Sequence, residues 1–241
     1  MMATMGVNVV VGIRHQISMD DPDDEAVTEF AADLFSVRQA LVDCALPVWE
    51  EPEVGSAEVV DFELFGEAGV HALRRVAAHL QTYAILPPPD EDDDDAADDE
   101  TLQVVYDEGP RYWVQPKQGE QPAVHGHPND ASEAYDHLIH HSDADGCYVP
   151  VEFAPVIVDE RAYGGYVGSA HRLLEECLRL AVALQIPLDL DPDSDEVWDA
   201  ADGTLEGAKG WQRYGVETYT CLRLIDAARR SIETGAAIFF V

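Results

Sequence analysis

The sequence predicts an α+β fold, in which about four longer helices pack on a mostly antiparallel sheet of about five or six strands. Several short runs rich in β-branched residues are bounded by glycine, proline or acidic turns, which is typical of strands. Four longer stretches repeat apolar residues at spacings of three and four, which is typical of helices that bury one face. Apolar residues make up 46% of the chain, enough for a sizeable core.

The N-terminal part predicts two strand–helix pairs. Residues 7–13 form a β-branched run with a glycine near its end, which predicts a strand. An acidic segment then precedes an apolar stripe over 27–42, and carboxylates at that place suit the positive end of a helix dipole. A second strand is expected over 59–65 and a second helix over 70–80. Three basic side chains are expected on the solvated face of this helix: Arg74, Arg75 and His79.

The central part is expected to be rich in short elements. Residues 102–106 and 111–114 predict two strands joined by a turn. A short helix is expected over 132–141. The run 148–158 predicts a strand at a sheet edge, because it carries two prolines that cannot donate ladder hydrogen bonds.

The C-terminal part predicts two helices and a last strand. Ser169 can cap a helix whose apolar stripe continues to Leu184, and Pro187 ends it. A further helix has its stripe over 221–232, and residues 237–241 predict the final strand.

One acidic segment decides the expected domain organisation. Three prolines lead into residues 90–100, of which nine of eleven are acidic. Like charges repel and prolines oppose helix, so we expect residues 87–100 to form a flexible, disordered insertion in a single domain of residues 1–241. The alternative is two subdomains, 1–86 and 101–241.

The charge of the chain excludes several classes of function. Forty-eight acidic residues face fourteen basic ones, giving a formal net charge of −34. Such a charge repels nucleic acid and anionic membranes, so neither is expected as a partner. A basic protein is the partner that this charge would attract. Adaptation to high salt, in which hydrated carboxylates serve solubility only, is the alternative.

The location is expected to be cytoplasmic. Residues 1–13 do not have the pattern of a signal peptide, and no apolar run approaches the roughly 20 residues of a membrane span. Four widely spaced cysteines are expected to be buried, reduced thiols: Cys44, Cys147, Cys177 and Cys221.

A histidine- and aspartate-rich cluster is the strongest candidate for chemistry. Its members are His137, His140, His141, Asp143 and Asp145. On a helix His137 and His141 would lie one turn apart on one face, and imidazole and carboxylate are ligands for divalent transition metals. The cluster therefore suggests a metal-dependent hydrolase. The competing interpretation is a polar helix end followed by a turn, which needs no metal.

A second candidate site lies at the start of a helix. Gly165, Gly168 and Ser169 could present backbone amides to an anion at the helix N-terminus. The competing interpretation is that Ser169 only caps the helix.

Two segments together resemble a group of uncharacterised bacterial proteins. These proteins share a His-Ser-Asp-x-Asp-Gly-x-Tyr-x-Pro stretch, here residues 141–150, and a Gly-Ser-x-x-Arg-Leu-Leu helix start, here residues 168–174. The resemblance covers residues 135–180. It implies no activity, but it implies that these residues share one structural site.

The sequence alone does not establish a function, a cofactor or an oligomeric state. The leading hypothesis is a highly acidic cytoplasmic binding protein, including an immunity-type antagonist of a basic toxin. The metal-dependent hydrolase, with a divalent metal at the residue 137–145 cluster, and the salt-adapted protein are the alternatives.

Overall fold

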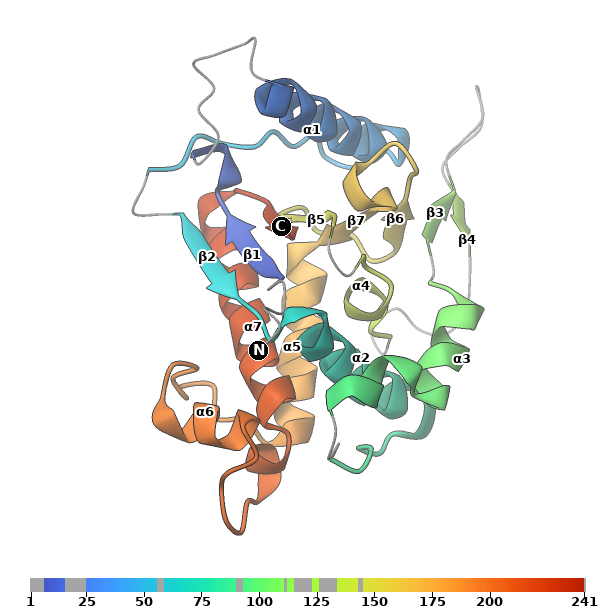
Figure 1. Cartoon of the computed structure of the whole chain (residues 1–241). Coiled ribbons are helices and arrows are strands. Elements are labelled where there is room, and N and C mark those ends of the chain that lie inside the picture. Colours follow the sequence, from blue (N-terminus) through green and yellow to red (C-terminus); the bar gives the residue numbers. More distant parts are fainter. Residues whose placement is uncertain are drawn as a thin grey trace.

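The computed structural model describes residues 7–15, 25–55, 59–89, 93–110, 112–114, 123–125, 134–142 and 145–240. Within them the fold is α+β, as predicted, with helices on both faces of one mixed sheet (Figure 1).

Eight short strands form the sheet in the order β2-β1-β8-β5-β7-β6-β3-β4. Five neighbouring pairs are antiparallel, and β5–β7 and β3–β6 are parallel, so the sheet is mostly antiparallel as expected. The strands are β1 (Asn8–Val11), β2 (Val60–Glu63), β3 (Tyr112–Val114), β4 (Ala123–His125), β5 (Cys147–Val149), β6 (Val156–Val158), β7 (Tyr166–Ser169) and β8 (Ile238–Phe240).

Four of the helices are long, and they are the four that the apolar stripes predict: α1 (Glu25–Asp43), α2 (Gly66–Tyr83), α5 (Ala170–Leu184) and α7 (Gly215–Thr234). Three are short: α3 (Glu100–Glu108), α4 (Asp136–Ile139) and α6 (Asp195–Ala201). In the described part of the chain, no helix combines the length and the apolar character that crossing a bilayer requires.

Successive side chains of the central strands point to opposite faces of the sheet, and each face has its own hydrophobic core. Ile238 and Phe240 of β8 join the larger core, which includes side chains of α2, α5 and α7, whereas Phe239 joins a smaller core with α1. Tyr148 and its neighbour Cys147 in β5 divide in the same way. Successive strand residues point to opposite faces, so a central strand with helices on both sides must be apolar throughout. Figure 1 accordingly shows α1 on one side of the sheet and α2, α5 and α7 on the other.

The central part differs from the sequence prediction in three ways. Residues 102–106 are not a strand but part of the helix α3. The run 148–158 is two strands, β5 and β6, and both lie inside the sheet rather than at its edge. Its prolines, Pro150 and Pro155, fall between the two strands, so neither interrupts a ladder. The short strands β4 and β7 were not predicted, which is why the sheet has eight strands instead of five or six.

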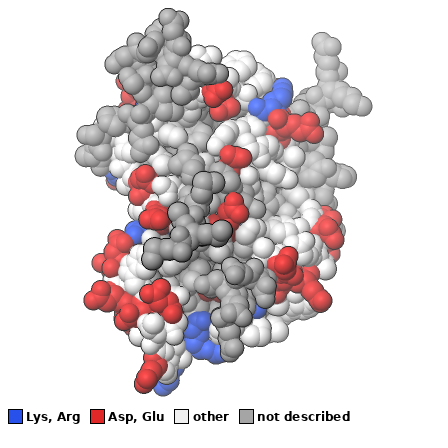
Figure 2. Space-filling view, in the orientation of Figure 1, with Lys and Arg blue, Asp and Glu red and all other residues white. Residues whose placement is uncertain are grey.

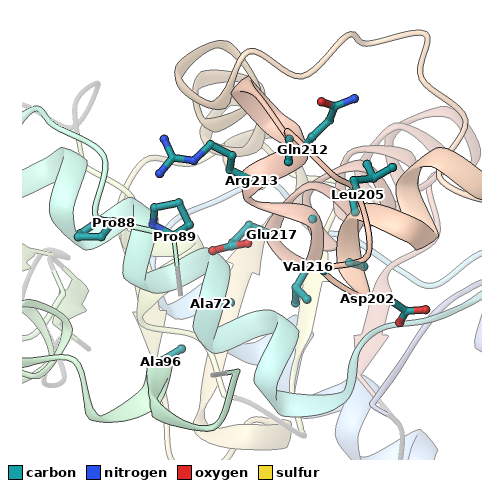
Figure 3. A pocket seen from close by; sticks show the side chains of 15 residues that line it. Ala72, Pro88, Pro89, Ala96, Asp202, Leu205, Gln212, Arg213, Val216 and Glu217 are labelled. Carbon is teal, nitrogen blue, oxygen red and sulfur yellow. The ribbon is translucent and has the colours of Figure 1, made fainter. Parts of the chain in front are cut away.

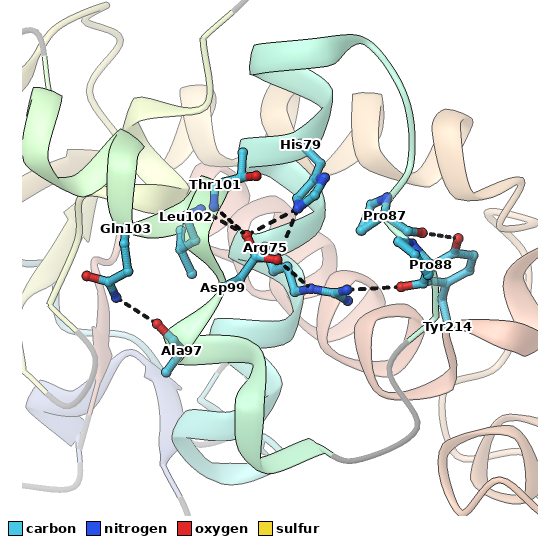
Figure 4. Close-up of polar contacts among 10 residues, drawn as sticks. All are labelled: Arg75, His79, Pro87, Pro88, Ala97, Asp99, Thr101, Leu102, Gln103 and Tyr214. Atoms are coloured by element: carbon cyan, nitrogen blue, oxygen red, sulfur yellow. Dashed lines mark hydrogen bonds and ion pairs between the residues drawn. The ribbon is translucent and has the colours of Figure 1, made fainter.

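The acidic segment 87–100 is partly structured where it is described. Residues 90–92 lie outside the described residues, but Asp93–Asp98 form a 3₁₀-helix that leads into α3. The start of the segment is held by two side chains: Tyr214 donates to the Pro87 carbonyl (2.7 Å) and Arg75 to the Pro88 carbonyl (3.1 Å) (Figure 4). The main core contains side chains from both sides of this segment.

Asp99 explains why a helix begins here. Its carboxylate accepts the backbone N–H groups of Thr101 (2.9 Å) and Leu102 (3.0 Å), the contacts of an N-cap. It also contacts Arg75 Nε and His79 Nε2, each at 3.1 Å, which ties α3 to α2 (Figure 4). Partial burial raises the pKa of Asp99, but the N–H group of Leu102 and the His79 and Arg75 side chains outweigh it, so the pKa is lowered.

We expect Asp99→Ala to lower the free energy of unfolding by about 2 kcal/mol, because the cap of α3 and a largely buried ion pair are lost together. Asp98→Ala is the matched control, because Asp98 is exposed and its substitution removes the same charge. Urea unfolding of both variants checks this; equal stability of the two would show that Asp99 does not hold α3 in place.

Candidate functional site

The three histidines of the predicted metal cluster are all buried. His137 is 1% exposed and lies in α4, while His140 and His141 follow directly after that helix. The same region contains Arg74 from α2 and Glu176 from α5, two buried charged residues. The site is therefore a polar cluster inside the protein, between α2, α4, α5 and the sheet.

His137 connects three separate segments through backbone groups. Its Nδ1 accepts the N–H of Ser169 (3.0 Å), so that nitrogen carries no proton. The proton is then on Nε2, which donates to the carbonyl of Ala154 (2.8 Å). The hydroxyl of Tyr148 donates to the carbonyl of His137 itself (2.7 Å). Both ring nitrogens of this neutral imidazole are thus engaged by the protein.

The other two histidines are also placed by packing. The ring of His141 stacks on Tyr148, with centroids 4.1 Å apart, and its nitrogens lie 3.1 Å and 3.3 Å from the carbonyls of Ser142 and Cys147. Burial, together with a smaller effect of the nearby Arg74, lowers the pKa of His140 to about 4. At neutral pH His140 is therefore uncharged.

The described residues do not assemble a metal site here or elsewhere: no three His, Cys, Asp or Glu side chains among them converge as ligands. Asp145 is exposed, and its carboxylate accepts the hydroxyl of Tyr163 (3.0 Å). Asp143 lies outside the described residues, so metal binding that depends on it stays a prediction.

Two of the three amides of the second candidate site, those of Gly165 and Ser169, are bonded within the protein. The N–H of Ser169 donates to His137, and its hydroxyl donates to the Val151 carbonyl (2.7 Å) and caps α5. The N–H of Gly165 donates to the carbonyl of Ala162 (2.9 Å). Gly168 packs against the ring of Tyr148, where an added Cβ would lie 2.2 Å from a ring carbon. The Tyr148 ring explains Gly168, the helix cap explains Ser169, and the left-handed backbone of Gly165 (φ +76°) explains that glycine. Anion binding at this helix start stays a prediction.

The two segments of the resemblance lie side by side. Strands β5 and β7 pair in parallel, with Tyr148 opposite Gly168, and His137 bonds to Ser169.

Two residues that hold α4, Glu176 and Arg74, were not predicted from the sequence. Glu176 accepts the N–H groups of His137 (3.2 Å) and Leu138 (2.8 Å) at the start of this helix. Arg74 donates to the carbonyls of Leu138 (2.8 Å), His141 (2.6 Å) and Ser142 (3.3 Å) at its end. The carboxyl oxygens of Glu176 thus satisfy N–H groups that have no partner within the helix, and the cation Arg74 at the C-terminus is the charge that the helix dipole favours there.

The expectation that Arg74 and Arg75 lie on a solvated face is wrong. They are 2% and 8% exposed. Arg74 is directed at carbonyl groups and Arg75 at Asp99 and Pro88, so both lie inward on α2. No periodic signal could have shown this, because their partners are far away in the sequence.

Exposed carboxylates are concentrated around α6. Eight acidic residues between positions 189 and 206 are all exposed, and this interval contains no lysine or arginine: Asp189, Asp191, Asp193, Asp195, Glu196, Asp199, Asp202 and Glu206. We call this set the α6 acidic surface. Asp193 accepts a hydrogen bond from Arg223, and Glu196 accepts one from Gln212 (2.8 Å). In Figure 2 acidic side chains far outnumber basic ones on the face shown, including the lower left, where α6 lies.

The α6 acidic surface is attached firmly to the core. Val197 and Ala200 are buried, and Trp198 packs against Phe65 and Tyr219 with ring centroids 5.4 Å and 5.2 Å away. Gly215 at the start of α7 allows close approach, because an added Cβ there would lie 2.2 Å from the carbonyl carbon of Ala200. The three carboxylates of α6 itself, Asp195, Glu196 and Asp199, are thus displayed from a fixed platform.

We expect the pH dependence of stability to reveal the buried Glu176. Burial raises its pKa to about 8, against two backbone N–H groups that lower it, whereas the unfolded chain ionises near 4.5. Folding therefore takes up a proton between these values, so stability falls as the pH rises from about 4.5 to about 8. In Glu176→Gln the slope should become shallower by up to about 1.4 kcal/mol per pH unit.

Glu175→Gln is the control, because its exposed carboxylate is next in the sequence. Chemical denaturation at several pH values measures both variants. Part of the slope should remain in Glu176→Gln, since burial also raises the pKa of Glu51 to about 7. If the slope of stability against pH is unchanged in Glu176→Gln, folding does not place a proton on Glu176.

The similarity to known proteins extends over the whole chain and is not confined to the polar cluster. A model of the family described as "Putative DNA-mimic protein" matches residues 5–240. No curated protein and no solved structure matches the chain. Because the match covers nearly all of the sequence, this chain belongs to that family.

Proposed function

We propose that this chain occupies the DNA-binding face of a basic protein, presenting carboxylates where DNA presents phosphates. The observation that carries the proposal is the α6 acidic surface, in which eight exposed carboxylates follow one another without an intervening basic residue. The description of the family and the net charge of −34 support it.

The physical basis is that DNA-binding proteins carry basic surfaces that are complementary to the negative charge of DNA. Double-stranded DNA carries one negative charge for about every 1.7 Å of its axis, and its partners meet it with lysine and arginine. A dense carboxylate surface attracts the same side chains and speeds encounter at low salt. The same charge repels DNA itself, so the chain would compete with DNA rather than bind it.

A fixed platform suits this role better than an acidic tail. An ordered surface loses less conformational entropy than a disordered tail when it binds, so more of the electrostatic attraction remains as affinity. Trp198 and Gly215 fix α6 on the core as described above. A cytoplasmic location, as the sequence predicts, would give the chain access to DNA-binding proteins.

The salt-adapted protein is the competing explanation of the charge. It requires no partner, and its carboxylates need no particular location. The immunity-type antagonist is a special case of the proposal, in which the basic partner is a toxin. The metal-dependent hydrolase has no support from the described residues, since the ring nitrogens of His137 and His141 contact backbone groups.

Competition with DNA tests the proposal. The chain is immobilised at low salt to select a basic protein from its source, and that protein is purified and bound to a short labelled DNA duplex. Adding the chain should release the duplex, and fluorescence anisotropy should fall. Neutralising four residues of the α6 acidic surface should weaken this competition by about tenfold. The substitutions are Asp189→Asn, Asp191→Asn, Asp195→Asn and Asp199→Asn.

The control neutralises four exposed acids elsewhere and changes the net charge equally: Glu29→Gln, Glu67→Gln, Glu152→Gln and Glu160→Gln. It should compete nearly as well as the unmodified chain. If no basic protein is selected, or if the duplex stays bound while the chain joins the complex, the mimicry proposal is wrong. If both variants weaken equally, net charge acts and the α6 acidic surface does not.

A further inference from the structure

The strand β2 forms one end of the sheet. It pairs with β1 alone, and Figure 1 shows it at the left end of the sheet, above α6. The Leu64 N–H, just after β2, donates to the Val7 carbonyl (3.1 Å). Because hydrogen-bonded pairs alternate along an antiparallel ladder, the register then turns the backbone groups of Val60 and Phe62 towards β1. Those of Asp61 and Glu63 point outwards.

The outward backbone groups are open to a further strand. The carbonyl of Glu63 accepts the hydroxyl of Tyr219 (2.9 Å), which agrees with its outward direction. The Glu63 N–H and both backbone groups of Asp61 bond to no other group in the described part of the chain. Unpaired N–H and C=O groups at a sheet edge are the groups to which an added strand binds.

The side chains of β2 indicate which strand would fit. Val60 and Phe62 pack against the main core, whereas Asp61 and Glu63 are exposed on the other face. A strand that alternates in the same way would place basic residues beside the two carboxylates and apolar residues beside the apolar ones. A second copy of β2 would place carboxylates opposite carboxylates, and like charges in that position destabilise pairing.

The edge of β2 adjoins the α6 acidic surface. Tyr219, the hydroxyl donor at this edge, packs against Trp198 of α6 with ring centroids 5.2 Å apart. The guanidinium of Arg223 lies over the ring of Phe62, 5.3 Å from its centroid, and donates to Asp193 of the α6 acidic surface. A partner docked on the α6 acidic surface therefore has the edge of β2 within reach.

A cavity of about 510 Å³ also opens beside α6, with Asp202 and Arg213 among its lining residues (Figure 3). It suits a basic side chain less well than the edge of β2 does. Its buried carboxylate, Glu217, already interacts within the protein, and Arg213 adds a positive charge to the wall. The exposed edge is therefore the better place for a basic segment.

We propose that the outer edge of β2 binds an extended basic segment of the DNA-binding partner as an added strand, in which lysine or arginine alternates with apolar residues. The inference rests on the proposed function, which supplies the basic partner. Basic arms that bind nucleic acid are segments without a fixed fold of their own. Backbone pairing gives such a segment a direction and a register on the chain, which attraction between charges alone does not give.

A peptide titration tests the edge directly. The ¹⁵N-labelled chain is titrated with the peptide acetyl-Thr-Lys-Val-Arg-Val-Lys-Thr-amide. It should give saturable shifts of the amide signals of Asp61 and Glu63, and hydrogen exchange of these two amides should slow. The same peptide N-methylated at its three basic residues keeps every charge but loses the donors that face β2. It should bind about tenfold or more weaker.

Variants of β2 separate backbone pairing from charge. Asp61→Pro removes an outward N–H without removing a bond to β1, because proline is tolerated where the N–H of an edge strand faces solvent, and it should abolish saturable binding. Asp61→Asn removes the same charge but keeps the N–H, so it should weaken the peptide by about fivefold at most. Glu160→Gln, at an exposed position beyond β6, should leave binding unchanged. The N-methylated peptide keeps the test valid if Asp61→Pro does not fold.

The inference fails if the peptide gives no saturable shifts at Asp61 and Glu63, if the N-methylated peptide binds equally well, or if folded Asp61→Pro binds as the unmodified chain does. Its failure is distinguishable from that of the proposed function. DNA competition that is unchanged in Asp61→Pro would overturn the edge as a contact of the partner and leave mimicry intact. A chain that binds the peptide at β2 but never displaces DNA would retain the added strand and lose mimicry.

Discussion

Repulsion among carboxylates is the constraint on which the rest of this structure depends. Forty-eight acidic side chains face fourteen basic ones, so ion pairs on the surface cannot neutralise the folded chain. Stability must come from inside, and the sheet accordingly buries both of its faces under helices. Several of the few cations are used inward as well. Arg74 and Arg75 are buried, and Arg179 packs over the ring of Tyr135 at 4.5 Å and donates to the Ala134 carbonyl.

This inward use of cations has a direct consequence for the surface. Each arginine that holds a backbone carbonyl inside the protein leaves surface carboxylates without a partner. The α6 acidic surface is one place where this imbalance is large, and its helix is also joined to the core by Trp198 and Gly215. The buried cluster around α4 and the acidic exterior therefore have the same cause, which is that several of the few cations lie in the interior. The first organises the interior, and the second is available for recognition.

Much of the fold could be predicted from the sequence, because the four long helices and the strands at both ends of the chain have regular apolar patterns. The central part could not. Residues 102–106 include adjacent valines that favour a strand, and the helix there depends on Asp99, which is one more acid within an acidic run. Local sequence patterns indicate only the intrinsic preference of a segment for helix or strand. The cap of α3 also depends on contacts of Asp99 with Arg75 and His79, which are tertiary contacts.

The candidate site shows the same limit. The sequence pointed to the histidines near residue 140, but the ring nitrogens of His137 and His141 have backbone groups as their partners. Arg74 and Glu176 were missed because charged residues are expected at the surface, and their contacts span 64 and 39 residues along the chain. The charge predicted a basic partner without any geometry, and the description of the family agrees with that prediction.

The most direct measurement of the central claim is the salt dependence of the association constant between the chain and its basic partner, compared with that of the same partner bound to DNA. If carboxylates replace phosphates, the logarithm of the constant should fall linearly with the logarithm of salt concentration in both complexes. The chain neutralised at four positions of the α6 acidic surface should show a shallower slope. An association that is nearly independent of salt would contradict the account, because the partner would then recognise something other than the acidic surface.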